Sequence, residues 1–121
     1  MTINRKVKPL LPSLREKKRY LVFEVISNEE IREFSSIKEA IWQSNLALLG
    51  ELGMGEAGLW MLEDKWQQEE QKGIMRVNNK YIDKLRVSLS LIKEAEQKQV
   101  IVRSVGISGT LKKAQEKFLA S

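Results

Sequence analysis

The chain has 121 residues, the size of one compact domain, and its composition is 42% hydrophobic and 31% charged, which is enough to build a buried core. It contains no cysteine and no histidine, which excludes disulfides, thiolate metal sites and the commonest general base and zinc ligand. No apolar run approaches the roughly 20 residues of a membrane span, and no apolar segment of signal-peptide length follows the basic N-terminus. We therefore expect a cytoplasmic protein that binds no metal, no cofactor and no membrane.

The net charge of +5 is concentrated at the two ends of the chain. Residues 1–19 carry +6 and residues 110–121 carry +2, which leaves the intervening segment at −3. Basic ends around a weakly acidic middle are typical of a protein whose termini touch a polyanion. Basic tails that serve only solubility are the alternative.

The first part of the chain predicts an arm, a strand and a helix. Residues 1–18 contain both prolines and many charges and predict a basic N-terminal arm, after which residues 19–121 form a single domain. Residues 19–27 are rich in β-branched and aromatic side chains, which favours a strand. Ser36, with a glutamate three positions later, has the capping-box pattern and predicts the start of a helix that ends at Gly50.

The rest of the chain predicts, in order, a glycine-rich connection (51–58), two strands of a hairpin (58–66 and 72–78), a helix (79–95), a strand (99–107) and a final helix (110–119). Each of these two helices has one apolar stripe at helical spacing, formed by Ile82, Leu85, Leu89 and Ile92 and by Leu111, Ala114, Phe118 and Leu119.

This order of elements predicts an α+β domain with the βαββαβ topology of ferredoxin-like and RNA-recognition-like folds. The expected sheet has four antiparallel strands in the order 4-1-3-2. Right-handed crossovers place both main helices on one face, and the C-terminal helix is an addition.

The open face of such a sheet often binds RNA through aromatic residues, but these are missing here. The third strand has Lys72 and Gly73 of the usual pattern, yet Ile74 and Arg76 stand at its aromatic positions. On the first strand, alternation places Tyr20 and Phe23 on opposite faces. Base stacking on the sheet is therefore not expected.

Alternation suggests another use for this face. Arg103, Glu24 and Arg76 can form a cross-strand row of charges, with apolar side chains around them. Either another protein covers the face, through Tyr20, Ile74 and Ile101, or the face is solvated and holds a weak surface ion pair. The first helix adds a similar question, because it has a second apolar stripe formed by Trp42, Leu46 and Leu49. Either the C-terminal helix or a partner chain covers this stripe.

Catalytic patterns are absent. The adjacent acidic pairs fall at strand ends or in loops, no phosphate-loop pattern occurs, and no histidine exists to activate a serine. The turn at Ser108, Gly109 and Thr110 is more informative. It is either an ordinary helix cap or a place where helix amides and the following lysines bind a phosphate.

Four segments together resemble one family. "LPSLREKKRYLVFEVIS", "AIWQSNLALLGELG", "RVSLSLI" and "VGISGTLKKAQEKFL" are similar, in the same order, to the archaeal ribonuclease P protein component 2 family, which is related to a eukaryotic ribonuclease P/MRP subunit. The resemblance implies an RNA-recognition-like fold without stacking aromatics. It also implies a subunit that stabilises the catalytic RNA removing the 5′ leader of precursor tRNA, with magnesium bound by that RNA.

The resemblance further implies partners, namely ribonuclease P RNA, a barrel-type protein subunit and a second copy of the chain within a heterotetramer. The residues we expect to contact RNA lie in the arm and around the last turn: Arg15, Lys17, Lys18, Arg19, Ser108, Gly109, Thr110, Lys112, Lys113 and Lys117. Two other function classes use this topology. A ligand-sensing regulatory domain would have a pocket near residues 50–58, and a small phosphate-cleaving enzyme would need an arginine cradle where the sequence has "SNEEIREF".

Overall fold

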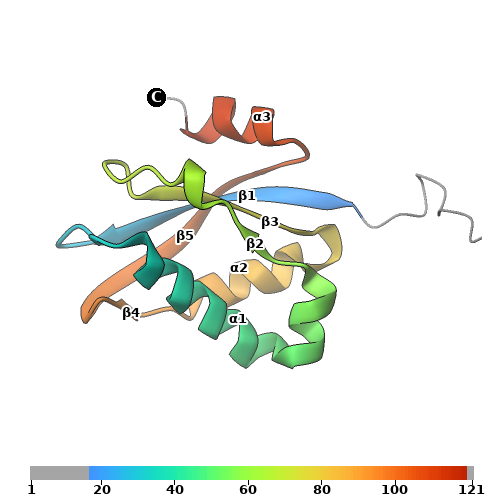
Figure 1. Ribbon diagram of the computed structural model, residues 1–121, viewed down its shortest axis with the longest axis horizontal. Helices are drawn as coiled ribbons and strands as arrows, with labels where there is room; N and C mark the ends of the chain where they lie inside the picture. The colour runs from blue at the N-terminus through green and yellow to red at the C-terminus, as the bar shows by residue number, and fades with distance from the viewer. Residues whose placement is uncertain (1–16, 120–121) are drawn as a thin grey trace, which may run out of the picture.

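The computed structural model describes residues 17–119, which form an antiparallel sheet with helices on both faces (Figure 1). The strands are β1 (Lys18–Ser27), β2 (Trp60–Met61), β3 (Lys72–Asn78), β4 (Glu94–Ala95) and β5 (Lys98–Ser108). The helices are α1 (Phe34–Ala57), α2 (Ile82–Ser90) and α3 (Leu111–Ala114), with short 3-10 segments η2 (Glu63–Lys65) and η3 (Asn79–Tyr81) and a π-helical segment η4 (Gln115–Leu119) continuing α3. None of the helices in the described part combines the length and apolar character that a bilayer crossing requires.

The α+β class is confirmed, but the predicted sheet is corrected. It has five strands in the order β2-β3-β1-β5-β4, where four in the order 4-1-3-2 were expected; the four expected strands are β1, β2, β3 and β5, and β4 is added at the edge beside β5. The additional strand, β4, has only two residues and pairs with the start of β5 through a tight turn. Both turn residues, Glu96 and Gln97, have positive φ angles of 52° and 63°, as a two-residue hairpin turn requires. The prediction includes this segment in the second helix (79–95), because a strand of two residues is too short to give a recognisable pattern.

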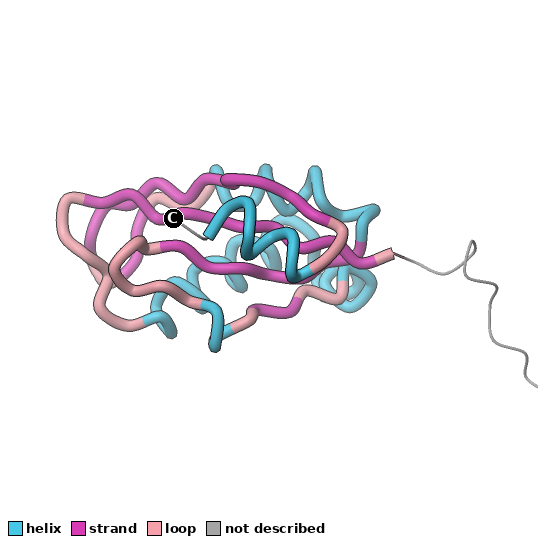
Figure 2. Tube along the Cα trace, turned by 90° about the horizontal axis from the view of Figure 1, so that it is seen from above, coloured by secondary structure: helices cyan, strands magenta, loops and turns pink. Residues whose placement is uncertain are grey.

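The two faces of the sheet are covered by different parts of the chain. Helices α1 and α2 lie on one face, and α3 lies on the other, as two perpendicular views show (Figures 1 and 2). The larger core lies between the sheet and α1–α2 and includes Leu21, Phe23 and Leu85. We call the α3 side the outer face. Its smaller core contains Val22 and Ile74 from the sheet and Ala114 and Leu119 from the C-terminal helix.

Helix α1 differs from its prediction at both ends. It begins at Phe34, and its N-cap residue Glu33 makes no side-chain capping bond, so Ser36 does not cap it. Gly50 does interrupt the helix, with φ 73° and ψ 174°, but the helix resumes and ends only at Gly58. Residues 51–57 are therefore helical rather than a connection, because Met54 and Ala57 are buried in the core and fix this second half.

The other helices keep the predicted apolar faces with altered lengths. Ile82, Leu85, Leu89 and Ile92 are all buried, although the helix itself stops at Ser90. The predicted C-terminal stripe packs on the outer face, so the suggestion that this helix covers the second stripe of α1 is wrong. The turn after β5 decides on which face this helix packs, because it directs the chain to the opposite side of the sheet.

The charge row predicted across the sheet is half correct. Glu24 stands opposite Arg103, whose Nε donates to Glu24 Oε1 at 2.8 Å. On the other side Glu24 faces Lys72, whereas Arg76 stands opposite Tyr20. A β-bulge between Val22 and Phe23 and the register of β3 determine these pairs. The alternation of side chains along one strand gives no information about bulges or register.

Candidate nucleic-acid interface

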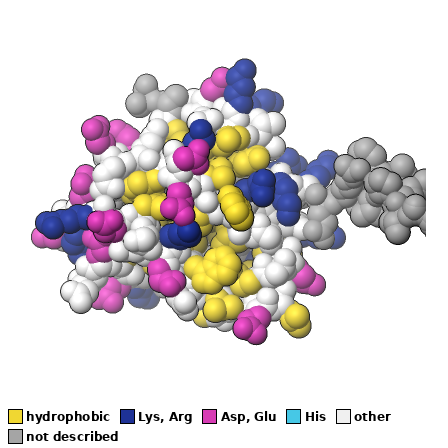
Figure 3. Space-filling model, in the orientation of Figure 1, with side chains coloured by type: hydrophobic (Ala, Val, Ile, Leu, Met, Phe, Trp, Pro, Cys, Tyr) yellow, Lys and Arg dark blue, Asp and Glu magenta, His cyan; other side chains and the backbone are white. Residues whose placement is uncertain are grey.

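Basic residues from two segments meet at one corner of the sheet. Lys17, Lys18 and Arg19 open β1, and Tyr20 pairs with Ser108 at the end of β5. The β5–α3 turn (108–110) and Lys112 and Lys113 follow directly. We call this set, Lys17–Arg19 with Ser108–Lys113, the basic corner. In the space-filling view, Lys and Arg side chains gather on the right of the molecule (Figure 3). The structure therefore brings together two groups of predicted RNA-contacting residues that lie about ninety positions apart, since antiparallel pairing joins the start of β1 to the end of β5.

The β5–α3 turn is a helix cap. Thr110 is the N-cap residue, and its Oγ1 accepts from the Lys113 N–H at 3.2 Å. The Thr110 N–H in turn donates to Ser108 Oγ at 3.3 Å. Of the two readings of this turn, the cap is present, and it leaves the exposed side chains of Lys112 and Lys113 at the first turn of the helix.

Arg19 is held beside this turn. Its Nε donates to Asn79 Oδ1 at 3.1 Å, and the Asn79 N–H donates to the Lys17 carbonyl at 2.7 Å. A Cβ atom on Gly109 would lie 2.7 Å from Arg19 Nη1, so the guanidinium occupies the space that a side chain there would need. Asn79 was not predicted as part of the site, because only the tertiary structure brings it next to Arg19.

No acidic side chain among the described residues forms an ion pair with a cation of the basic corner. Within residues 17–119, the ion pairs join Lys38 to Glu63, Lys65 to Asp64, Lys98 to Glu96 and Arg103 to Glu24, none of which includes a basic-corner residue. Charges without internal partners are available to an external polyanion. Arg76 adds one more cation near the corner. It stands opposite Tyr20 on the outer face, and its Nε is buried without a hydrogen-bond partner.

The remaining predicted RNA contacts are placed as follows. Lys18 extends over the end of α1, where its Nζ would lie 2.9 Å from a Cβ on Gly58. A cation there is favoured by the negative end of the helix dipole. Lys117 is exposed on η4. Arg15 lies outside the described residues.

The residues predicted to bind partners differ in how far they are exposed. Ile74 is fully buried under the C-terminal helix, so it cannot contact a partner while that helix is in place, and this prediction is corrected. Tyr20 packs at the edge of the same cluster and is half-buried. Ile101 is 62% exposed and pairs with Ile26, which is 44% exposed, beyond the end of the C-terminal helix. On α1, Trp42 is exposed, while Leu46 and Leu49 pack against the larger core.

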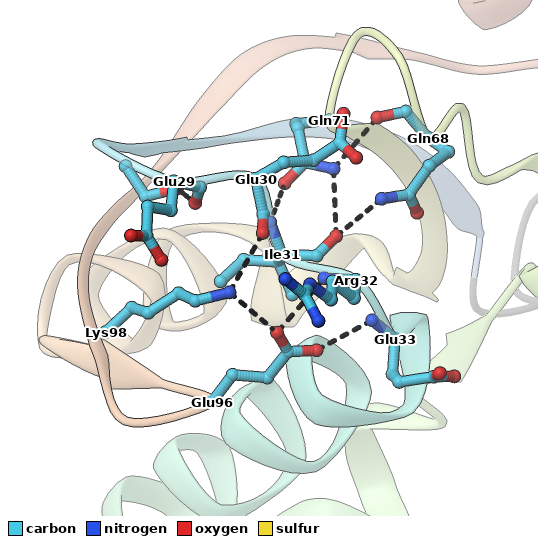
Figure 4. A network of polar contacts seen from close by, with 10 residues as sticks. Glu29, Glu30, Ile31, Arg32, Glu33, Gln68, Gln71, Glu96 and Lys98 are labelled. Carbon is cyan, nitrogen blue, oxygen red and sulfur yellow. Dashed lines mark hydrogen bonds and ion pairs between the residues drawn. The ribbon is translucent and has the colours of Figure 1, made fainter.

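The acidic loop between β1 and α1 has exposed acidic side chains at Glu29 and Glu30, while its backbone is fixed from both sides (Figure 4). Gln71 binds the backbone of the buried Ile31 at both groups: its Oε1 accepts from the Ile31 N–H at 3.0 Å, and its Nε2 donates to the Ile31 carbonyl at 3.2 Å. On the other side, Glu96 accepts from the N–H groups of Arg32 at 3.0 Å and Glu33 at 2.6 Å. Lys98 Nζ donates to Glu96 at 3.2 Å and completes the network.

Glu96 thus performs the capping function at the start of α1 that Ser36 was expected to perform. The N–H of Glu33, and next that of Arg32, lower the pKa of the Glu96 carboxyl from 4.5 to about 2. Burial opposes this shift and Lys98 reinforces it. The loop offers no arginine cradle because Arg32 is its one arginine, and the amides of Arg32 and Glu33 already bind a carboxylate of the chain itself.

A hollow of about 470 Å³ lies between the second half of α1 and α2. Two of its polar groups bind each other, since Tyr81 Oη donates to Glu56 Oε1 at 2.5 Å, and Lys84 Nζ lies 5.2 Å from the centre of the Tyr81 ring. Among residues 17–119, no three acidic side chains cluster as metal ligands would. The absence of catalytic residues remains a prediction.

The fold and the basic corner together define an α+β protein that presents, at one end of its sheet, cations without acidic partners among the described residues, as nucleic-acid-binding proteins do. The chain belongs to the Rpp14/Pop5 family, which matches residues 19–119.

Curated relatives cover nearly the whole chain. Ribonuclease P protein component 2 of Pyrococcus horikoshii is 40% identical over 96% of this chain and 94% of its own length. The protein of the same name from Methanocaldococcus jannaschii is 35% identical over 93% of this chain and 81% of its own length. A chain in the cryo-EM structure of yeast ribonuclease MRP has a similar fold, with a TM-score of 0.60, 15% identity and coverage of 80% and 77% of the two chains.

Proposed function

We propose that the protein is a subunit of ribonuclease P that binds and stabilises the catalytic RNA during removal of the 5′ leader from precursor tRNA. The match of residues 19–119 to the Rpp14/Pop5 family, with relatives named ribonuclease P protein component 2, carries this proposal. The chain is a component of an RNA-containing ribonucleoprotein.

Electrostatics provides the mechanism. Folding a large RNA brings phosphates together around bound magnesium, and protein cations lower that repulsion and release counterions. The basic corner can act in this way because its charges have no acidic partners among residues 17–119. The protein then lowers the magnesium requirement of the RNA and binds no cofactor itself. Contacts to shape and phosphates suffice, so the missing aromatic platform is no obstacle.

The proposal includes protein partners and the place of action. A barrel-type ribonuclease P subunit and a second copy of this chain are the partners, in a heterotetramer that works in the cytoplasm. The exposed Trp42 on α1 and the exposed Ile26–Ile101 pair are separate apolar surfaces, and they suit two different protein contacts. The RNA-recognition-like βαββαβ arrangement, with β4 inserted before β5, is the framework of the subunit.

A regulatory domain that senses a small ligand is not favoured. In the hollow beside α1, Tyr81 and Glu56 bind each other, which leaves Lys84 as the remaining charged group of the lining, whereas a specific ligand site typically has several convergent polar groups.

The test is RNA-dependent cleavage of precursor tRNA by the reconstituted complex. Replacing Lys112 and Lys113 by alanine should weaken RNA binding and raise the magnesium concentration that half-maximal activity requires. The slope of log affinity against log salt should become shallower by up to about 2, one for each lost phosphate contact.

A matched control removes two exposed cations from the helix-covered side, Arg86 and Lys93. This variant has the same net charge and should retain the wild-type salt and magnesium profiles. Equal loss in both variants would show that only total charge matters, and unaltered activity of the Lys112/Lys113 variant across the whole series would contradict the proposed role.

A further inference from the structure

Arg19 differs from the other cations of the basic corner because its guanidinium is held in one orientation. The Nε–Asn79 bond fixes one side of the planar group, and Asn79 is itself anchored by its backbone bond to Lys17. A guanidinium bound through Nε keeps both Nη groups for another ligand. Arg19 is half-buried, and it forms no ion pair with an acidic residue of the described chain.

The neighbouring glycine is part of the same arrangement. Nothing but the guanidinium opposes a side chain at position 109, since Arg19 supplies every atom within 4 Å of the Cβ position. The turn itself therefore accepts alanine, and the absence of a side chain serves to admit Arg19. The two free Nη groups then lie beside the turn that leads to Lys112 and Lys113.

We infer that Arg19 is a preoriented, bidentate phosphate-binding residue for the RNA backbone, positioned by Asn79 and admitted by Gly109. This inference rests on the proposed function and adds a particular contact to it. Paired Nη donors match two oxygens of one phosphate, whereas a lysine offers only a point charge. Orientation in advance reduces the conformational entropy lost on binding, so Arg19 should contribute more than its charge alone.

Three substitutions separate orientation from charge. Gly109→Ala keeps every charge and pushes the guanidinium aside. Asn79→Ala keeps every charge and releases Nε. Asn79→Asp keeps an acceptor for Nε but adds a negative charge that pairs with the guanidinium and opposes a phosphate. We expect each to weaken binding of full-length protein to ribonuclease P RNA, about threefold to tenfold for the alanine variants and more for Asn79→Asp.

Arg19→Ala gives the reference. It should lower affinity about tenfold and reduce the salt slope by about 1. Adding Gly109→Ala to Arg19→Ala should cause no further loss, because the methyl group then has nothing to displace. Arg86→Ala, which removes an arginine from the opposite side, should retain wild-type affinity. Thermal unfolding should show unchanged stability for Gly109→Ala.

The outcomes are distinct. Full affinity of Gly109→Ala, or additive losses of Gly109→Ala and Arg19→Ala, would overturn the role of Arg19 while leaving RNA binding by the subunit intact. Losses confined to binding of the barrel-type protein subunit would also overturn it. If the wild-type protein does not bind the RNA at all, the proposed function fails instead.

Discussion

The ring of Phe118 lies directly over Gly106, in the space that a Cβ atom on Gly106 would occupy. That atom would lie 2.1 Å from two ring carbons, closer than any real contact. The glycine belongs to β5 and the ring to the C-terminal helix, so this contact holds the helix against the sheet. The same helix buries Val22 and Ile74.

Gly106→Ala is therefore expected to displace the C-terminal helix and to lower the free energy of unfolding by about 1–3 kcal/mol, as overpacking does. Chemical denaturation measures the loss, and hydrogen exchange should show increased opening of residues 111–119. Gly55→Ala is the matched control, because nothing lies within 4 Å of its Cβ position. Gly55 lies in the last turn of α1, and alanine there should raise stability by up to about 1 kcal/mol. Equal stability of the two variants would refute the role of the Phe118 contact.

The lowered pKa of Glu96 predicts that the stability of the fold depends on pH. Its pKa is lowered to about 2 in the folded protein, from 4.5, because the ionised carboxylate accepts from the Glu33 and Arg32 amides. The carboxylate therefore stabilises the fold fully above pH 4.5, and this contribution is lost as the pH falls from 4.5 towards 2.

Glu96→Gln should lower the free energy of unfolding near neutral pH by about 1 kcal/mol, in the range of helix-cap substitutions. The difference from wild type should shrink as the solution is acidified through that window. Glu94→Gln, an exposed change on the same hairpin, serves as the control. A difference between Glu96→Gln and wild type that stays constant with pH would count against this capping role.

Replacing Gln71 is expected to lower stability more than its place among polar residues in the sequence suggests. Gln71→Ala removes both hydrogen bonds to the Ile31 backbone, and Ile31 is completely buried. The Ile31 carbonyl keeps its hydrogen bond from Gln68 Nε2, but the Ile31 N–H loses its side-chain acceptor, and leaving that group unpaired should cost about 1–3 kcal/mol. Gln99→Ala, at an exposed position on β5, should change stability by less than about 0.5 kcal/mol. Urea denaturation of both variants tests this, and similar midpoints would argue against a structural role for Gln71.

The Arg103–Glu24 pair should contribute little, despite its short 2.8 Å distance. The Arg103 side chain is 58% exposed, so water and salt screen the attraction. Arg103→Ala is expected to change the free energy of unfolding by less than about 1 kcal/mol, and by less at high salt. A large, salt-insensitive loss would mean that the pair is packed more tightly than its exposure implies.

Sequence patterns were most informative where the determinants are local. Alternation identified β1, β3 and β5, and helical spacing identified the buried stripe through Leu85 and the apolar face of the C-terminal helix. Sequence patterns did not predict features that depend on a residue far away in the chain. The cap of α1 comes from Glu96, more than sixty positions away, and no local signal predicts it. The helix beyond Gly50 depends on burial of Met54 and Ala57.

The candidate site shows the same division. Composition located the charges of the basic corner, because lysines and arginines cluster in the sequence itself. It did not reveal how Arg19 is oriented, since Asn79 and Gly109 come from segments far along the chain. Nor did it show that Ile74 is covered, because the side on which the C-terminal helix packs depends on the geometry of one turn.

The central position of β1 has a consequence for biosynthesis. Its two neighbours, β3 and β5, are synthesised long after it, so β1 leaves the ribosome with both edges unpaired. The nascent chain must keep a strongly apolar strand unassembled until Ser108 has emerged, and such segments are prone to intermolecular pairing. The smaller core on the outer face closes last of all, when the C-terminal residues become available. We therefore expect that a ribosome-bound chain ending before β5 depends on chaperones, whereas the complete chain folds without them.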